Sequence, residues 1–171
     1  CIRDRTKSRI EGVRPVIEAI RSGRRRVFEV ELPDERKTPG LRELAELLKE
    51  RGIAIRTPER RPPGATAGRV VARAEPFPEE SFEALLDSVR PRMLVGLDRV
   101  TDVGNLGSIA RSAEAAGVKG LILEHRHAPP IGPGVLRGSA GAIEHLRVGR
   151  TPNLARALDF ARSEGLCVVA A

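Results

Sequence analysis

The residues best suited to chemistry lie in the run 98–117. Asn105 carries an amide that can donate and accept hydrogen bonds, and Arg111 carries a planar guanidinium that matches the geometry of phosphate. Gly104 and Gly107 permit tight backbone geometry or the close approach of a ligand. Because an apolar run precedes this segment and an Ala-rich run follows, we expect an anion-binding site between a strand and a helix.

An ordinary strand–turn–helix would explain the same residues. Asn105 would then cap the helix, and Arg111 would be a solvated surface side chain. A Gly-x-x-Gly pair is weak evidence, and the loop lacks the Gly-x-Gly-x-x-Gly pattern of dinucleotide-binding folds. Spacing alone leaves both interpretations open.

The elements around this run predict a parallel α/β domain over 92–171. Apolar runs alternate with helical periodicity, and this alternation favours a parallel sheet with helices on its faces. We expect strands at 93–97, 119–123 and 166–171, helices at 108–116 and 153–164, and a turn or short helix at 135–142. Ligands of such sheets lie beyond the carboxyl ends of the strands, so the loops 98–107 and 124–134 should form the active edge.

The first part of the chain predicts a smaller α/β domain over 1–75, joined by a linker at 76–91. Apolar periodicity and Gly or Pro boundaries indicate its elements. We expect a loose tail at 1–9, helices at 13–22 and 39–51, strands at 27–32, 53–56 and 69–74, a loop at 57–67, and a short helix at 81–89 within the acidic, Pro-bounded linker.

Net charge is +7 with a pI near 10.6, which favours an anionic partner, nucleic acid first of all. An Arg-rich composition bias is the alternative. Aromatic content is only 2%, which argues against base stacking on aromatic platforms. Side chains that could touch RNA, or equally form a solvated face or a structural turn, are Arg24, Arg25, Arg26, Arg60, Arg61, Arg137 and Ser139.

Cys1 and Cys167 give no disulfide framework and no metal spacing, and Cys167 is expected to be buried in its apolar run. His125 and His127, without Cys or carboxylate partners, make a poor metal site, so we expect no metal. Without a leader or a long apolar run, the default expectation is a cytoplasmic protein with no membrane partner. The chain begins without Met and stops inside an apolar stretch, which suggests a fragment.

Several segments in the right order resemble the SpoU-type RNA 2′-O-ribose methyltransferases of the trefoil-knot class. The run 98–117 resembles their first signature motif, and segments 139–145, 153–158 and 10–20 add to the likeness. The resemblance implies a ribosomal-protein-like substrate-binding domain followed by the first part of a parallel-sheet knot methyltransferase domain. Departures are Val103, where the family often has Pro, and Thr66-Ala67-Gly68, where many members carry His-Gln-Gly.

By this resemblance, Asn105 and Arg111 are catalytic residues that act on a ribose 2′-hydroxyl of structured RNA, with S-adenosylmethionine as methyl donor and no metal. The likeness is greatest to the subgroup that modifies a guanosine of large-subunit ribosomal RNA, although antibiotic-resistance and transfer-RNA relatives share the motif. A homodimer is implied as well. A guanidinium loses its proton only far above neutral pH, which makes a neutral Arg base costly, so we expect Arg111 to act as a fixed cation that Asn105 helps to orient.

The family's donor-binding motifs would follow Ala171, so we expect this chain alone to bind S-adenosylmethionine poorly. Two other interpretations therefore stay open. One is a non-catalytic RNA-binding module, and the other is a nucleotide-binding α/β enzyme unrelated to methyl transfer. Glu114 and Glu144 are expected to form structural ion pairs with nearby Arg side chains.

Overall fold

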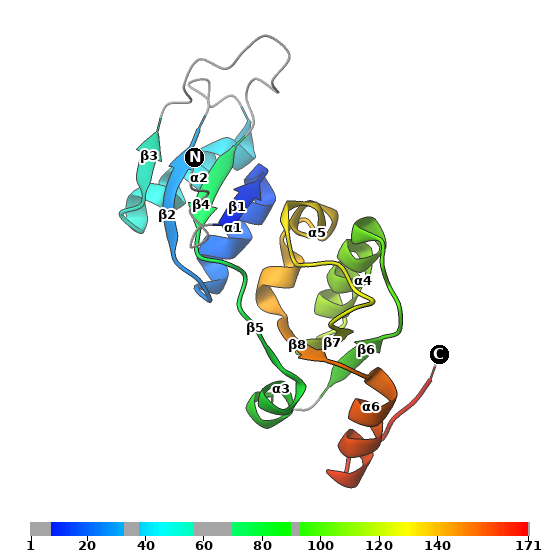
Figure 1. Cartoon of the computed structure of the whole chain (residues 1–171). Coiled ribbons are helices and arrows are strands. Elements are labelled where there is room, and N and C mark those ends of the chain that lie inside the picture. The colour runs from blue at the N-terminus through cyan, green and yellow to red at the C-terminus, as the bar shows by residue number, and fades with distance from the viewer. Residues whose placement is uncertain (1–7, 33–37, 57–69, 90–92, 171) are drawn as a thin grey trace, which may run out of the picture.

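The structure is a computed structural model that describes residues 8–32, 38–56, 70–89 and 93–170. Arg60, Arg61 and the predicted loop at 57–67 lie outside the described residues. Two four-stranded sheets divide the chain (Figure 1), as the sequence predicts for an α/β protein with two domains. No described helix has the length and apolar character needed to cross a membrane.

The first sheet has the strand order β1-β4-β2-β3. Its strands are β1 (Ser8–Glu11), β4 (Val71–Ala74), β2 (Val27–Glu31) and β3 (Ala54–Arg56). β4 pairs antiparallel with both β1 and β2, whereas β2 and β3 are parallel. The tail predicted at 1–9 is therefore wrong for Ser8 and Arg9, which pair with β4.

Two helices pack together with this sheet, α1 (Val13–Ser22) and α2 (Pro39–Glu50). α1 buries Val16, Ile17 and Ile20, whose helical spacing places them on one face. It ends at Gly23, whose φ of 63° is left-handed and favours glycine. Thr38 caps the amino-terminal end of α2, because its hydroxyl accepts a hydrogen bond from a backbone N–H of the first turn.

The second sheet has the order β5-β8-β7-β6 and is parallel throughout. Its strands are β5 (Glu79–Ser81), β8 (Arg147–Thr151), β7 (Gly120–Glu124) and β6 (Leu94–Leu97). Its helices are α3 (Phe82–Ser88), α4 (Val103–Ala115), α5 (Pro133–Gly138), the 3-10 helix η1 (Ala142–His145) and α6 (Leu154–Ser163). In Figure 1, α6 lies at the end of the molecule farthest from the first sheet.

The segment predicted as a linker at 76–91 contributes both β5 and α3, and β5 pairs with β8 along the second sheet. The short helix expected at 81–89 is confirmed as α3. One hydrophobic core cluster includes Ile17 and Leu44 of the first domain together with Leu106 and Leu121 of the second. The two domains therefore share a continuous core, while their boundary positions stay a prediction.

Two predictions near the carboxyl end are wrong. The strand expected at 166–171 is absent from residues 166–170, which pair with neither sheet. Cys167 is consequently exposed rather than buried, and Val169 is 83% exposed. Of residues 166–170, only Leu166 packs against the smaller apolar cluster beneath α3 and α6.

Candidate functional site

The amino-terminal end of α4 forms one wall of a surface hollow. Asp102 caps the helix, because its Oδ1 accepts a hydrogen bond of 2.7 Å from the backbone N–H of Asn105. The helix therefore begins at Val103, earlier than the start predicted at 108, and Asn105 lies in its first turn rather than in a loop. The lining residues are Arg99, Val100, Thr101, Asp102, Asn105, Ser108 and Ile109.

Arg111 lies further along α4, is exposed, and does not line this hollow. Arg111 lies six positions after Asn105 in the helix, which places the two side chains about 120° apart around the helix axis. The structure shows no hydrogen bond between them, so it gives no support to an orienting role for Asn105. Within the described ranges Arg111 makes no hydrogen bond or ion pair, so its guanidinium is available to an external anion.

Gly107 serves packing rather than ligand approach. A Cβ at this position would lie 2.7 Å from the Cα and carbonyl carbon of Gly138, so the backbones of α4 and α5 touch here. Gly104 has more room, because the atom nearest its Cβ position is Oδ1 of Asp102 at 3.1 Å. The close approach predicted from the two glycines is thus a helix–helix contact at Gly107.

The RNA contact predicted for Ser139 is wrong, because the residue is fully buried and its hydroxyl donates to the carbonyl of Leu136 at 3.2 Å. Arg137 has a half-exposed side chain that donates to Oε2 of Glu11 at 2.6 Å. An RNA phosphate at Arg137 would have to compete with this carboxylate. An RNA contact there stays a prediction.

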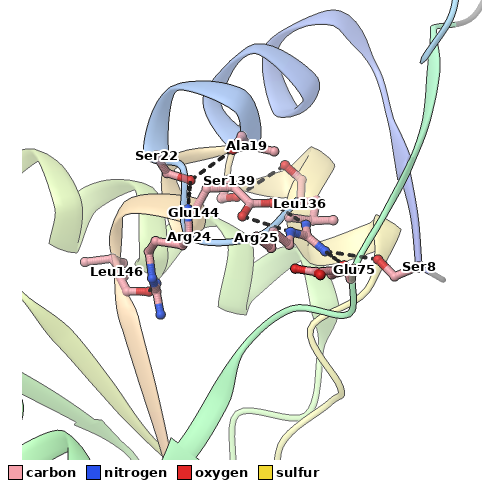
Figure 2. A network of polar contacts seen from close by, with 10 residues as sticks. All are labelled: Ser8, Ala19, Ser22, Arg24, Arg25, Glu75, Leu136, Ser139, Glu144 and Leu146. Carbon is pink, nitrogen blue, oxygen red and sulfur yellow. Dashed lines mark hydrogen bonds and ion pairs between the residues drawn. The ribbon is translucent and has the colours of Figure 1, made fainter. Parts of the chain in front are cut away.

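The three consecutive arginines after α1 have different environments. Arg25 is buried against Glu144, so its predicted RNA contact is wrong, and the ion pair expected for Glu144 is confirmed (Figure 2). Arg24 donates to a backbone carbonyl of the second domain, and burial lowers the pKa of Arg24. Arg26 is exposed and lies over the ring of Phe28 at 5.4 Å, so it stays a candidate for RNA. Elsewhere in the described chain, the ion pair expected for Glu114 is not found.

A second hollow opens at the carboxyl edge of the parallel sheet, as the sequence predicts for this edge. Its lining includes Asp98, Arg99, Glu124, His127 and Asn153. Oε1 of Glu124 accepts from the backbone N–H of Leu154 at 3.2 Å, and Oε2 lies 3.1 Å from Nδ1 of His127. His127 thus has a carboxylate neighbour that the sequence did not predict, although Glu124 directly follows the strand predicted at 119–123 and is the last residue of β7.

No group of three or more His, Cys, Asp or Glu side chains is placed to bind a metal within the described residues. Arg99 lines both hollows, so they are neighbours. The hydrogen bond from the backbone N–H of Leu154 lowers the pKa of Glu124, and His127 adds to this shift.

The lowered pKa of Glu124 predicts a stability loss in acid. Its carboxylate stabilises the fold above the ordinary Glu pKa of about 4.3, and the contribution disappears as pH falls through the lower folded value. Glu124→Gln should therefore lower the unfolding free energy at pH 7, and the difference from the unmodified chain should shrink below about pH 4.3. Urea unfolding at several pH values measures this, with exposed Glu114→Gln as control. A difference that does not vary with pH would contradict the assignment.

Comparisons with known proteins match both domains. Residues 92–171 match the model of the SpoU rRNA Methylase family, and residues 9–61 match that of the RNA 2′-O ribose methyltransferase substrate-binding domain. The 23S rRNA (guanosine-2′-O-)-methyltransferase RlmB of Pseudomonas syringae pv. tomato is 32% identical over 169 residues, which cover 94% of this chain and 68% of the relative. The chain belongs to the SpoU family of RNA methyltransferases.

Solved structures agree with this assignment. The SpoU methyltransferase AviRb from Streptomyces viridochromogenes, solved in complex with the cofactor AdoMet, is 28% identical with a TM-score of 0.70. The alignment covers 94% of this chain and 60% of AviRb. An rRNA methyltransferase from Sinorhizobium meliloti is 25% identical with a TM-score of 0.64, covering 92% of this chain and 59% of that one. YacO of Bacillus subtilis is 31% identical, and the chain spans 66% of its length.

Proposed function

We propose that the protein carrying this chain transfers a methyl group from S-adenosylmethionine to a ribose 2′-hydroxyl of structured RNA. The target that we propose is a guanosine of large-subunit ribosomal RNA. The observation that carries the proposal is Arg111, an exposed and unpaired cation on the helix that also carries Asn105 beside a hollow. The family match, the name of the RlmB relative and the net charge of +7 support RNA as substrate.

Arg111 acts in this proposal as a permanent cation. An unpaired guanidinium can bind the phosphate beside the target ribose and stabilise the negative charge that develops on the 2′ oxygen. Contact with a phosphate favours the charged form of the guanidinium, which makes proton abstraction by a neutral guanidine still less favourable. Asn105 contributes an amide to the neighbouring hollow, where it can hydrogen-bond a ribose hydroxyl or a phosphate oxygen.

The described residues do not form a complete donor site. In the hollow at the carboxyl edge, both carboxylate oxygens of Glu124 already have partners, and Oδ1 of Asn153 accepts from the backbone of Arg156. Of the described carboxylates that line this hollow, Asp98 is the one whose oxygens stay open to the ribose and ammonium groups of S-adenosylmethionine. We therefore assign donor binding, and the trefoil knot of the family, to residues beyond those described. A non-catalytic RNA-binding module is the alternative that this incomplete donor side favours.

The family also implies a homodimer, and the absence of a disulfide framework in the sequence favours the cytoplasm as compartment. We include the homodimer and the cytoplasmic location in the proposed function. Light scattering coupled to size exclusion should give twice the subunit mass for the full-length protein, and a monomer at micromolar concentration would contradict the dimer.

Arg111→Lys in the full-length protein tests the role of the guanidinium. Lysine keeps the charge but loses the planar fork, so we expect kcat for RNA methylation to fall about 100-fold or more while RNA affinity stays nearly unchanged. Methyl transfer from labelled S-adenosylmethionine and a filter-binding assay measure the two quantities. Arg156→Lys, at an exposed position on α6, is the matched control. Near-full activity of Arg111→Lys would count against a bidentate contact in the transition state.

A further inference from the structure

Arg25 and Glu144 form a buried ion pair between the two domains. Their side chains are 1% and 0% exposed. Nε of Arg25 donates to Oε2 of Glu144 at 3.2 Å, and Nη2 contacts the other carboxylate oxygen, so the pairing is bidentate. Arg25 lies two positions before β2 of the small domain, whereas Glu144 belongs to η1 of the methylase domain, and Figure 2 shows them facing each other.

Both donors of Nη1 of Arg25 are also hydrogen-bonded. Nη1 donates to Oγ of Ser8 at 3.0 Å and to the backbone carbonyl of Glu75 at 3.0 Å. The guanidinium therefore connects η1 with the start of β1 and the residue that follows β4. A bidentate Arg–carboxylate pair in a low-dielectric interior has a strict geometric requirement, because the planar fork of the guanidinium fits the carboxylate in one orientation.

Neighbouring contacts fix the same interface. Nε2 of His145 lies 2.9 Å from Oε2 of Glu18 on α1, and Arg137 on α5 pairs with Glu11 on β1 at 2.6 Å. A Cβ at Gly141, whose φ is +90°, would lie 2.9 Å from Cα of Pro15 on α1. The two domains therefore touch at backbone distance around the buried pair.

The same interface is continuous with the helix that carries the candidate catalytic residues. η1 and α5 both pack against α4. At the centre of that packing, the backbones of Gly107 and Gly138 are in contact. The elements that contact the small domain, η1 and α5, thus pack directly on α4, the helix that carries Arg111.

We infer that Arg25 is a positioning residue that holds the small domain at one orientation to α4. The protein then selects RNA by the spacing between the RNA element that the small domain recognises and the target ribose. The inference rests on the proposed function. A buried ion pair contributes little net stability compared with apolar packing, yet it specifies one geometry.

A distance measurement tests the positioning directly in the full-length protein. Spin labels on Glu46→Cys in α2 and Arg156→Cys in α6, both exposed, report the separation of the two domains after Cys1 and Cys167 are replaced by Ser. We expect one narrow distance distribution for the unmodified pair and a broad one for Arg25→Glu. A distribution that stays narrow in a folded Arg25→Glu variant overturns the inference.

Two further variants make the distance measurement decisive. Arg162→Glu reverses the same charge at an exposed position on α6 and should leave the distribution narrow. Glu144→Gln keeps the shape of the side chain and removes its charge, so it should broaden the distribution even where Arg25→Glu does not fold. If Arg162→Glu broadens the distribution as much as Arg25→Glu, or Glu144→Gln leaves it narrow, the assignment of Arg25 as a positioning residue is wrong.

Activity on two RNAs separates positioning from general damage. A short RNA that carries only the target nucleotide engages the methylase domain alone, whereas the complete structured RNA engages both domains. For Glu144→Gln we expect kcat/KM to fall about tenfold or more on the structured RNA and little on the short one. Equal losses on both RNAs would overturn the inference. If the unmodified protein methylates neither RNA, the proposed function fails, while the distance distributions still decide whether Arg25 fixes the domains.

Discussion

Replacing Arg25 with methionine should lower the unfolding free energy by roughly 3–5 kcal/mol, because Glu144 then keeps its charge in a buried site without a partner. Ser8 and the carbonyl of Glu75 lose a donor in the same step. Urea denaturation followed by circular dichroism measures this loss. Arg21→Met breaks the partly exposed ion pairs of α1 with Glu18 and Glu43 and should cost less than about 1 kcal/mol.

The double variant Arg25→Met/Glu144→Leu identifies the source of that cost. If the loss comes from the unpaired carboxylate, removing the carboxylate as well should recover most of the stability, since apolar side chains of similar volume often replace buried ion pairs at no cost. A double variant less stable than Arg25→Met would contradict this explanation. It would show that the hydrogen bonds to Ser8 and Glu75 matter more than the charge.

Gly107→Ala should destabilise the protein by roughly 1–3 kcal/mol or more, because the added Cβ would overlap the backbone of Gly138 at 2.7 Å. The sign is informative, since alanine in place of glycine inside a helix ordinarily gains up to about 1 kcal/mol. Ser108→Ala at the next, exposed position serves as control and should be neutral or stabilising. Thermal unfolding measures both, and a raised midpoint for Gly107→Ala would contradict the packing of α4 on α5.

Local patterns predicted most of the helices well. α1 and α2 follow from apolar residues at helical spacing and from their boundary residues, Gly23 and Thr38. The start of α4 was misjudged because Asp102 and Asn105 are both good capping residues, and only the hydrogen bond identifies Asp102 as the cap. Sequence periodicity cannot decide between two capping candidates that are three positions apart.

β8 was not predicted, for a different reason. It carries Arg147 and Arg150, charged residues that argue against a buried strand. Arg150 is nevertheless 8% exposed, because Glu79 of β5 pairs with it at 2.8 Å and a carbonyl of β7 accepts from it. Glu80 pairs with Arg147 in the same way. These partners lie far away in sequence, so the strand is visible only once the sheet is assembled.

The candidate site was predictable only where a local motif exists. Asn105 and Arg111 follow from their motif, and the structure leaves both exposed. Arg25 and Ser139 were grouped with surface arginines and loop residues, yet both face the interior. The partner of Arg25 is 119 positions away, and no local signal distinguishes a buried arginine from its solvated neighbours. Glu124 was not predicted as a site residue, because a single carboxylate at the end of a strand forms no recognisable motif.

Mapping the methyl group tests the central claim most directly. The full-length protein is incubated with ribosomal RNA and S-adenosylmethionine, and resistance of the RNA to alkaline cleavage locates 2′-O-methylated riboses. The predicted result is one protected linkage, at a guanosine, that disappears with Arg111→Gln. Tight RNA binding without any protected linkage, or a methyl group found on a base, would contradict the account, and the first of these would favour a non-catalytic RNA-binding module.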